Sequence, residues 1–139
     1  MPESFQTTRR VQFRDTDAAG IVHFSVFFTY MEEAEHQLWR HLQLSVKQED
    51  GDGVISWPRV SAQCDYKSPV RFEDEITITM TVQRIGAKSV TFAFDLSLAD
   101  REIATGTLTA VCCRIPKDGV PQAIEIPAAY RAKLESLST

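Results

Sequence analysis

Two aspartates near the start of the chain could carry chemistry, in the stretch "FRDTDAAGIVHF" (13–24). Asp15 and Asp17 come just before Gly20, and a strongly apolar segment follows. One carboxylate there would be an ordinary helix cap, because the N–H groups at a helix start favour negative charge. A cap reaches N–H groups two or three residues further on, however, and Asp17 stands about seven positions before the expected helix. Gly20 lets the chain turn back, so Asp17 could face the helix start across a pocket.

A carboxylate that faces a helix start is suited to acyl transfer. Such a group can attack an activated carbonyl, or it can orient a water molecule to do so. A backbone N–H at the helix start can polarise the carbonyl oxygen. A thioester fits this small set of groups, because its thiolate leaving group is weakly basic and needs little help from an acid. Thioester hydrolysis is one interpretation of the pair, and capping by one or both aspartates is the other.

The segment after the glycine has the apolar spacing of a helix. From Phe24 or Ser25 to Leu42, apolar residues recur every three or four positions, which is the repeat of one helix face. The stripe consists of Phe27, Met31, Ala34, Leu38 and Leu42. A helix this apolar needs another element to cover it.

Five alternating runs predict the strands of that covering sheet. The first is "TTRRVQFRDT" (7–16), with Val11 and Phe13 expected on the same side. The other four span 59–67, 74–85, 88–99 and 102–115, and short polar connections join the last three as in an antiparallel meander. Between and after them we expect a polar loop at 48–53, an irregular stretch at 116–127 and a short helix at 128–137. The fold class is therefore α+β, with an antiparallel sheet that curls round one long helix and leaves edges for pairing with another chain.

Length and composition limit the classes of protein to which the chain could belong. The 139 residues suit a single domain, 1–139, and the net charge of −4 disfavours binding to nucleic acid. No apolar run approaches the roughly 20 residues of a membrane span, and the N-terminus lacks the pattern of a signal peptide. The three cysteines have no metal-type spacing, and reduced thiols in a cytoplasmic protein are the expected state.

Several common site motifs are missing from the sequence. It contains no G-x-S-x-G nucleophile elbow, no phosphate-binding loop and no G-x-G-x-x-G. Glu33 and His36 form one Glu-x-x-His pair, whereas a di-iron bundle needs two such pairs and further glutamates on four helices. We therefore expect no bound metal.

Two stretches of the sequence resemble a known family. "DTDAAGIVHFSVFFTYMEEAE" (15–35) resembles the signature of the hydroxybenzoyl-CoA thioesterase-like family of hotdog-fold acyl-CoA thioesterases. "VSAQCDYKSPVRFEDEITI" (60–78) is similar to the second signature of that family, and the resemblance covers roughly residues 7–115. It implies the hotdog fold, in which a five-stranded antiparallel sheet wraps a long central helix. Naphthoyl-CoA thioesterases of quinone synthesis and short-chain thioesterases associated with the Tol-Pal system share the first block, so the acyl group stays open.

The resemblance also implies roles for the residues of the first block. Asp17 falls on the catalytic carboxylate, which acts as nucleophile or as base for water, and Gly20 falls on the turn glycine. Phe24 falls on the residue whose backbone N–H polarises the thioester carbonyl, and Asp15 falls on a supporting acidic residue. Some relatives have an aromatic residue followed by histidine here. The order in this chain is His23 and then Phe24, so His23 either takes part in catalysis or only packs.

Substrate contacts are implied in the same way, without a cofactor, since CoA is part of the acyl-CoA substrate. The expected contacts to the acyl and pantetheine parts are Phe27, Tyr66 and Lys67, with Tyr66, Lys67 and Pro69 supplied by a partner chain of a homodimer or homotetramer whose active sites lie at the interface. Cations are needed for the phosphates. The first candidates are Arg84, Lys88 and Ser89 around the "IGA" turn, followed by Arg71, Arg114 and Lys117.

Three alternatives to this mechanism remain. A hotdog dehydratase would use a histidine such as His23. A non-catalytic module that binds acyl-CoA or acyl-carrier protein would keep the basic surface and not depend on Asp17. Glu33 on the helix is the second candidate for the catalytic carboxylate if Asp17 is not the one.

Overall fold

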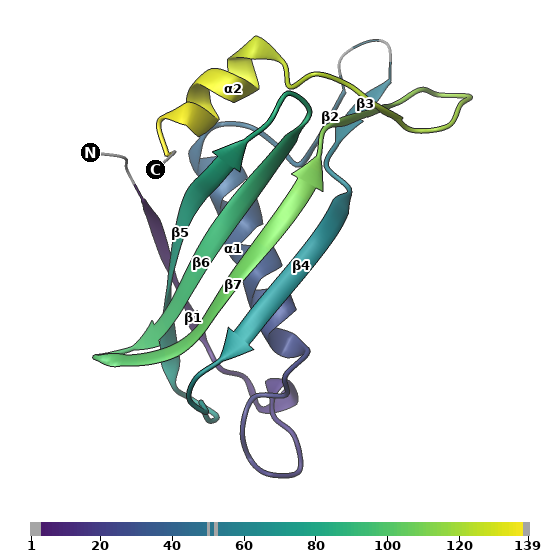
Figure 1. Ribbon diagram of the computed structural model, residues 1–139. Helices are drawn as coiled ribbons and strands as arrows, with labels where there is room; N and C mark the ends of the chain where they lie inside the picture. The colour runs from purple at the N-terminus through teal and green to yellow at the C-terminus, as the bar shows by residue number, and fades with distance from the viewer. Residues whose placement is uncertain (1–3, 50, 52, 138–139) are drawn as a thin grey trace.

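The chain forms one main sheet with a helix across one of its faces (Figure 1). The computed structural model describes residues 4–49, 51 and 53–137. The sheet has five antiparallel strands in the order β1-β5-β6-β7-β4. These strands are β1 (Phe5–Arg10), β4 (Arg59–Tyr66), β5 (Glu75–Ile85), β6 (Ser89–Leu98) and β7 (Arg101–Val111). Helix α1 (Val26–His41) belongs to the long connection between β1 and β4 and lies behind the sheet in Figure 1.

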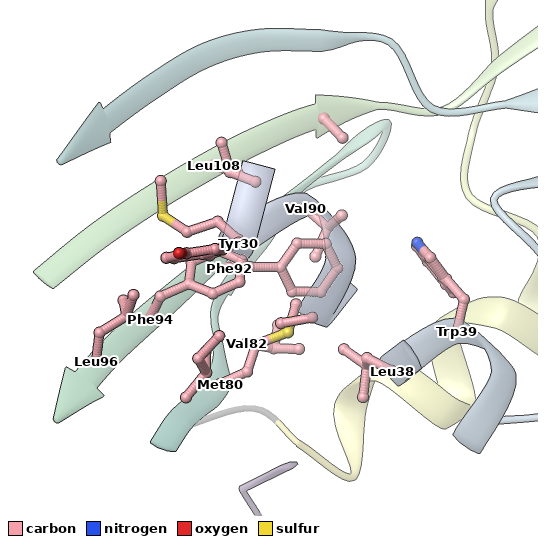
Figure 2. Close-up of a cluster of buried hydrophobic side chains, with 14 of the residues drawn as sticks. Tyr30, Leu38, Trp39, Met80, Val82, Val90, Phe92, Phe94, Leu96 and Leu108 are labelled. Atoms are coloured by element: carbon pink, nitrogen blue, oxygen red, sulfur yellow. The ribbon is translucent and has the colours of Figure 1, made fainter. Parts of the chain in front are cut away.

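Alternation of apolar and polar residues builds the face of the sheet that α1 covers. Along β5 every second side chain is buried, and threonines occupy the positions between them. The buried residues of β5 are Ile76, Ile78, Met80 and Val82. Their neighbours on β6 repeat the pattern with Phe92, Phe94 and Leu96. The expected meander of three long strands is therefore confirmed, and Figure 2 shows its side chains gathered against those of α1.

Helix α1 presents the predicted apolar stripe to this face. Phe27, Met31, Ala34 and Leu38 are buried, while Leu42 follows the last helical residue and is half-buried. With sixteen residues, the helix is of moderate length and shorter than the expected span. A glycine lets it approach β7 closely, because a Cβ at Gly106 would lie 2.4 Å from the sulfur of Met31.

The segment between β1 and α1 differs from the prediction of one strand over 7–16. Strand β1 ends at Arg10, and Phe13–Asp15 form a turn of 3-10 helix. The side chain of Asp15 accepts the N–H of Gln12 at 2.8 Å and closes this turn. As a consequence Val11 is buried and Phe13 is 75% exposed, so the two do not share a side as their spacing suggested.

A second, smaller sheet was not predicted. It has the order β2-β3-β8-β9 and consists of β2 (Lys47–Glu49), β3 (Val54–Ser56), β8 (Cys113–Ile115) and β9 (Gln122–Ala123). Most of the expected polar loop at 48–53 lies between its first two strands, and residues 50 and 52 lie outside the described residues. The expected fifth run is split at Cys112 into β7 and β8.

The final helix, α2 (Ala128–Glu135), lies at the end of the sheet where α1 finishes (Figure 1). Tyr130, Leu134 and the following Leu137 are buried, so the helix is anchored by its apolar side. The main chain adds a hydrogen bond of 3.0 Å from the N–H of Val82 to the carbonyl of Leu137. In the part of the chain that the structure describes, no helix is long and apolar enough to cross a membrane.

Candidate active site

A pocket of about 450 Å³ opens at the N-terminal end of α1. One wall comes from the loop that precedes the helix, one from the first turn of the helix, and one from the connection that follows β4. Its lining residues are Asp17, Ile21, Val22, Phe24, Phe27, Tyr66, Lys67, Ser68 and Pro69. Most of this lining is apolar or aromatic, with one carboxylate and one ammonium group, as is usual for small-molecule sites.

Asp17 is held in this pocket by a tight turn. Its N–H donates to the carbonyl of Ile21 at 2.8 Å, and its own carbonyl accepts the N–H of Gly20 at 2.9 Å. The Oδ1 atom accepts the N–H of Ala19 at 2.8 Å, as in an Asx turn. Gly20 has φ +81°, which a residue with a side chain adopts only at a cost. Among the described residues nothing bonds to Oδ2 of Asp17, so this oxygen can act on a substrate or on water.

The N–H of Phe24 is an unused donor at the start of α1. No acceptor in the described part of the chain takes it. This N–H shares its peptide group with the carbonyl of His23, which accepts the N–H of Val26 at 3.0 Å. That hydrogen bond polarises the peptide group and makes the N–H of Phe24 a stronger donor. On its other side, the carbonyl of Phe24 accepts the hydroxyl of Tyr66 at 2.8 Å. The residue is thereby fixed from both sides, while its side chain is 63% exposed.

His23 is engaged in closing the first turn of the helix. Its Nδ1 accepts the N–H of Ser25 at 3.2 Å and lies 2.8 Å from the Ser25 hydroxyl. The ring stacks on that of Phe24 with centroids 4.6 Å apart. His23 is not among the residues that line the pocket, although both of its neighbours in sequence are.

Asp15 points away from the pocket into the protein. It is 5% exposed, and its Oδ2 accepts the hydroxyl of Tyr30 at 2.8 Å and lies 3.5 Å from the guanidinium of Arg9. Burial, with the hydrogen bond to Asp15, raises the pKa of Tyr30 far above its usual value, so its hydroxyl stays protonated and donates. The backbone carbonyl of Asp15 accepts the N–H of His23 at 2.9 Å. Asp15 thus joins the loop, the helix and β1, whereas Asp17 faces the pocket.

The sequence did not identify Arg9 and Tyr30 as the partners of Asp15. Arg9 also binds Glu33, with Nε 2.8 Å from Oε1, and its guanidinium lies 5.1 Å from the ring centre of Tyr30. Glu33, the second candidate for catalysis, is therefore paired with an arginine and does not line the pocket. The only indication in the sequence was the position of Arg9. The alternation of side chains along β1 places it on the face of the strand that α1 covers.

The third wall of the pocket belongs to the same chain as Asp17. The rings of Tyr66 and Phe27 meet edge to face with centroids 5.2 Å apart. Arg101 holds the connection after β4, because its Nη1 donates to the Ser68 hydroxyl at 2.7 Å and to the Pro69 carbonyl at 2.9 Å. Tyr66, Lys67 and Pro69 line the pocket together with Asp17 of the same chain, and their supply by a partner chain stays a prediction.

The candidate phosphate-binding residues lie at the other end of the sheet. Arg84 is near the end of β5, Lys88 is in the turn to β6, and Ser89 begins β6. Figure 1 shows this turn at the end of the sheet opposite to the loop that holds Asp17. The eleven residues of β5 correspond to roughly 35 Å of strand. A single chain therefore keeps these cations well away from its own pocket.

The other cations are more scattered. Arg71 pairs through its backbone with Ile21 and is exposed near the pocket, whereas Arg114 and Lys117 belong to the region of the second sheet. For metal ions, no group of three or more His, Cys, Asp or Glu side chains in the described ranges is arranged to hold one.

A carboxylate, and a backbone N–H without an acceptor among the described residues, thus belong to residues that line one largely apolar pocket. The fold that carries this pocket has the hotdog topology. Residues 11–134 match the family model described as the Thioesterase-like superfamily. The chain belongs to this family, and it is an enzyme of the thioester hydrolase class.

Relatives and solved structures agree with this assignment. A 1,4-dihydroxy-2-naphthoyl-CoA hydrolase from Nostoc punctiforme is 28% identical over 109 residues, which are 78% of this chain and 74% of the relative. A gentisyl-coenzyme A thioesterase of known structure is 29% identical, with a TM-score of 0.81 over 94% of this chain and 99% of the other. The fold is also that of a 1,4-dihydroxy-2-naphthoyl-CoA thioesterase from Synechocystis, with TM-score 0.86 and 23% identity over 97% of this chain and 98% of the other.

Proposed function

We propose that the protein is an acyl-CoA thioesterase that releases an aromatic or a short- to medium-chain acid from CoA, with Asp17 as its catalytic carboxylate. One observation carries the proposal: Asp17 and Phe24 line the same pocket, and the N–H of Phe24 has no acceptor among the described residues. The carboxylate provides the base or nucleophile, and the N–H is the donor that a developing oxyanion requires.

In this mechanism the thioester carbonyl oxygen accepts the N–H of Phe24. Asp17 takes a proton from water as the water oxygen attacks the carbonyl carbon, or its own oxygen attacks and forms an anhydride that water then opens. In both routes the C–S bond breaks as the tetrahedral intermediate collapses, and CoA leaves as a thiolate that takes up a proton. The contacts of His23 support a part in holding the helix start, with no proton transfer assigned to it.

The lining of the pocket supports an aromatic acyl group. Ile21 and Val22 supply an apolar side, and the rings of Phe24, Phe27 and Tyr66 can contact a planar group by stacking or by their edges. The relatives named for naphthoyl-CoA and gentisyl-CoA act on aromatic acyl groups. Lys67 stands among the lining residues, where its ammonium can meet the pantetheine amides or a ring hydroxyl.

A dimer would complete the site for CoA. β4 is an edge strand and pairs only with β7 among the described strands, and its Val60 is 63% exposed. If two copies pair along β4, the two-fold axis makes their β4 strands antiparallel. The sheet of the partner is then turned end for end relative to the first sheet. The Arg84–Ser89 region of the partner would then lie at the same end of the joint sheet as Asp17. Pairs of such dimers would form the proposed homotetramer.

Thiol release from a panel of aromatic and aliphatic acyl-CoA esters tests the proposal. Wild-type protein should release thiol from at least one aromatic ester, and Asp17→Asn should reduce kcat by about a thousandfold. Asn keeps the side-chain oxygen that accepts the N–H of Ala19, so the turn should persist. Asp118→Asn, a change at an exposed aspartate far from the pocket, is the matched control.

Other outcomes of the same panel favour the alternative functions. Binding of acyl-CoA without any thiol release would identify a binding module. Hydration of an enoyl-CoA without thiol release would identify a dehydratase. Thiol release that is unaffected by Asp17→Asn would remove Asp17 from the mechanism.

A further inference from the structure

We propose that Arg131, on the C-terminal helix α2, is a positioning residue for the phosphates of CoA and acts through the turn between β5 and β6. The proposal rests on the proposed function, in which this turn binds the phosphate end of the substrate. Arg131 itself need not touch the substrate. Its part is to fix the direction of the peptide groups in the turn.

All three carbonyl groups of the turn accept hydrogen bonds from residues that follow later in the chain. The carbonyl of Gly86 accepts Nη2 of Arg131 at 2.8 Å. The carbonyl of Ala87 accepts the same Nη2 at 3.2 Å and the N–H of Ile126 at 3.0 Å. The carbonyl of Lys88 accepts the N–H of Cys112 at 2.7 Å. The negative end of each of these peptide dipoles is therefore already bonded to a donor.

Two of these three peptide groups have an N–H without a partner among the described residues. In the described ranges of the chain, the backbone N–H groups of Ala87 and Lys88 have no acceptor. Successive N–H groups without partners make a concave site for an anion. The side chains of Lys88 and Arg84 are exposed at the same turn and add two positive charges. The turn thus offers backbone donors and cations together, which suits a phosphate group.

Helix α2 is well placed to hold Arg131 steady. Tyr130 and Leu134, on either side of Arg131 along the helix, are buried. Lys133 donates to the carbonyl of Leu42 at the end of α1 with a distance of 2.7 Å. Arg131 is half-buried and reaches the turn from this fixed helix. Without its guanidinium, the Gly86 carbonyl would lose its donor and could rotate toward the phosphate, which it would repel.

Two substrates separate this role from a general effect on the enzyme. We would compare an acyl-CoA with the N-acetylcysteamine thioester of the same acid, which lacks the phosphates. Arg131→Met should raise KM for the CoA ester by about five- to tenfold, the value of one or two lost hydrogen bonds. It should leave kcat, and all constants for the short thioester, unchanged within about twofold.

Arg131→Gln tests whether position or charge is responsible. Glutamine keeps an N–H donor for the carbonyls and removes the charge, so KM for the CoA ester should be partly restored relative to Arg131→Met. Equal KM values for the two variants would show a charge effect and overturn the proposal, as would an equal rise in KM for both substrates. Glu135→Gln, an exposed change on the same helix, is the control.

Lys88→Ala distinguishes failure of this proposal from failure of the proposed function. A rise in KM for the CoA ester in Lys88→Ala, with none in Arg131→Met, would overturn only the role of Arg131. If Lys88→Ala also leaves KM for the CoA ester unchanged, the turn does not bind phosphates and the positioning role is lost with it.

Discussion

The two ends of helix α1 are built from similar groups and are used in opposite ways. At the N-terminal end the helix start is left open, because the N–H of Phe24 has no acceptor in the described part of the chain and a pocket lies beside it. At the C-terminal end the rings of Trp39, Trp57 and Tyr130 close the core, with centroids 5.1–6.1 Å apart. There the carbonyl of Leu42 is covered by the ammonium of Lys133. A backbone N–H is thus left available at one end, whereas a backbone carbonyl at the other end is bonded by a lysine.

The two ends of α1 also differ in the contacts of a buried carboxylate, Asp15 near the open end and Glu35 nearer the closed end. Glu35 is fully buried and accepts Nε1 of Trp39 at 3.0 Å and the guanidinium of Arg59 at 2.5 Å. Asp15 also binds an aromatic donor and an arginine, but its backbone carbonyl additionally accepts the N–H of His23, next to the proposed oxyanion donor of Phe24. The two carboxylates therefore have similar burial and similar partners, and they differ in whether their contacts reach the open end of the helix.

The largest effect on stability is expected at Glu35. Glu35→Leu leaves the Trp39 N–H without an acceptor and Arg59 without its carboxylate partner, so the free energy of unfolding should fall by about 3 kcal/mol. Because these contacts lie at the closed end, kcat should be unchanged where the protein is folded. Urea unfolding and thiol release measure the two quantities. Glu32→Leu, at an exposed position of the same helix, is the control. Loss of activity in folded Glu35→Leu would contradict the division between the ends.

Tyr30→Phe should affect both stability and activity, because Asp15 connects to the active loop. Loss of a hydrogen bond to a buried carboxylate should lower the free energy of unfolding by about 1.5 kcal/mol. We expect kcat to fall less than about tenfold, since the backbone contact of Asp15 with His23 remains. Calorimetry and initial rates check the two effects. A variant as stable as wild type would mean that this bond does not support the open end.

The same residue predicts a pH dependence. The pKa of Tyr30 is raised in the folded protein, mainly by burial and then by the hydrogen bond to Asp15. Its contribution to stability is full below the pKa of an unfolded tyrosine, near 10, and is lost as the pH rises toward the folded value. Between pH 9 and 11 wild type should therefore lose about 1.4 kcal/mol more than Tyr30→Phe. Equal losses of unfolding free energy in the two proteins would contradict this assignment.

The smallest effect is expected at the cap of the closed end. Lys133→Met removes the donor to the Leu42 carbonyl, and the charge near the end of α1, which together should cost about 0.5–1 kcal/mol. The change should lower the melting temperature slightly and leave kcat and KM as in wild type. A marked change in KM would connect α2 to the substrate through Lys133 as well as through Arg131.

Local patterns were sufficient to predict most of the main sheet and the helix. The alternation from Ile76 to Val82 and the spacing from Phe27 to Leu38 follow directly from burial of one face, and both were confirmed. The small sheet could not be found in this way. Its strands have two or three residues each, several of them polar, and β3 pairs with β8 about 60 positions later. The turn at Phe13–Asp15 was missed because a side-chain hydrogen bond there overrides an alternating pattern.

The candidate site could likewise be predicted only in part from the sequence. Asp17, Gly20 and Phe24 lie within eight consecutive residues, so one sequence motif was enough to identify them as candidates. The support for that motif comes from distant parts of the chain, namely Arg9 on β1, Tyr30 on α1 and Arg101 on β7. Arg131 is further still, and only the folded chain shows which carbonyls it binds. Such residues carry no local signature, because their partners are set by tertiary structure.

The kcat of Asp17→Asn for the best acyl-CoA ester tests the central claim most directly, because it asks whether the open end of α1 performs the chemistry. We predict a fall of about a thousandfold, equivalent to about 4 kcal/mol of transition-state stabilisation, with an unchanged free energy of unfolding. A kcat within about tenfold of wild type, in a protein of wild-type stability, would show that another group performs the hydrolysis and would contradict the account.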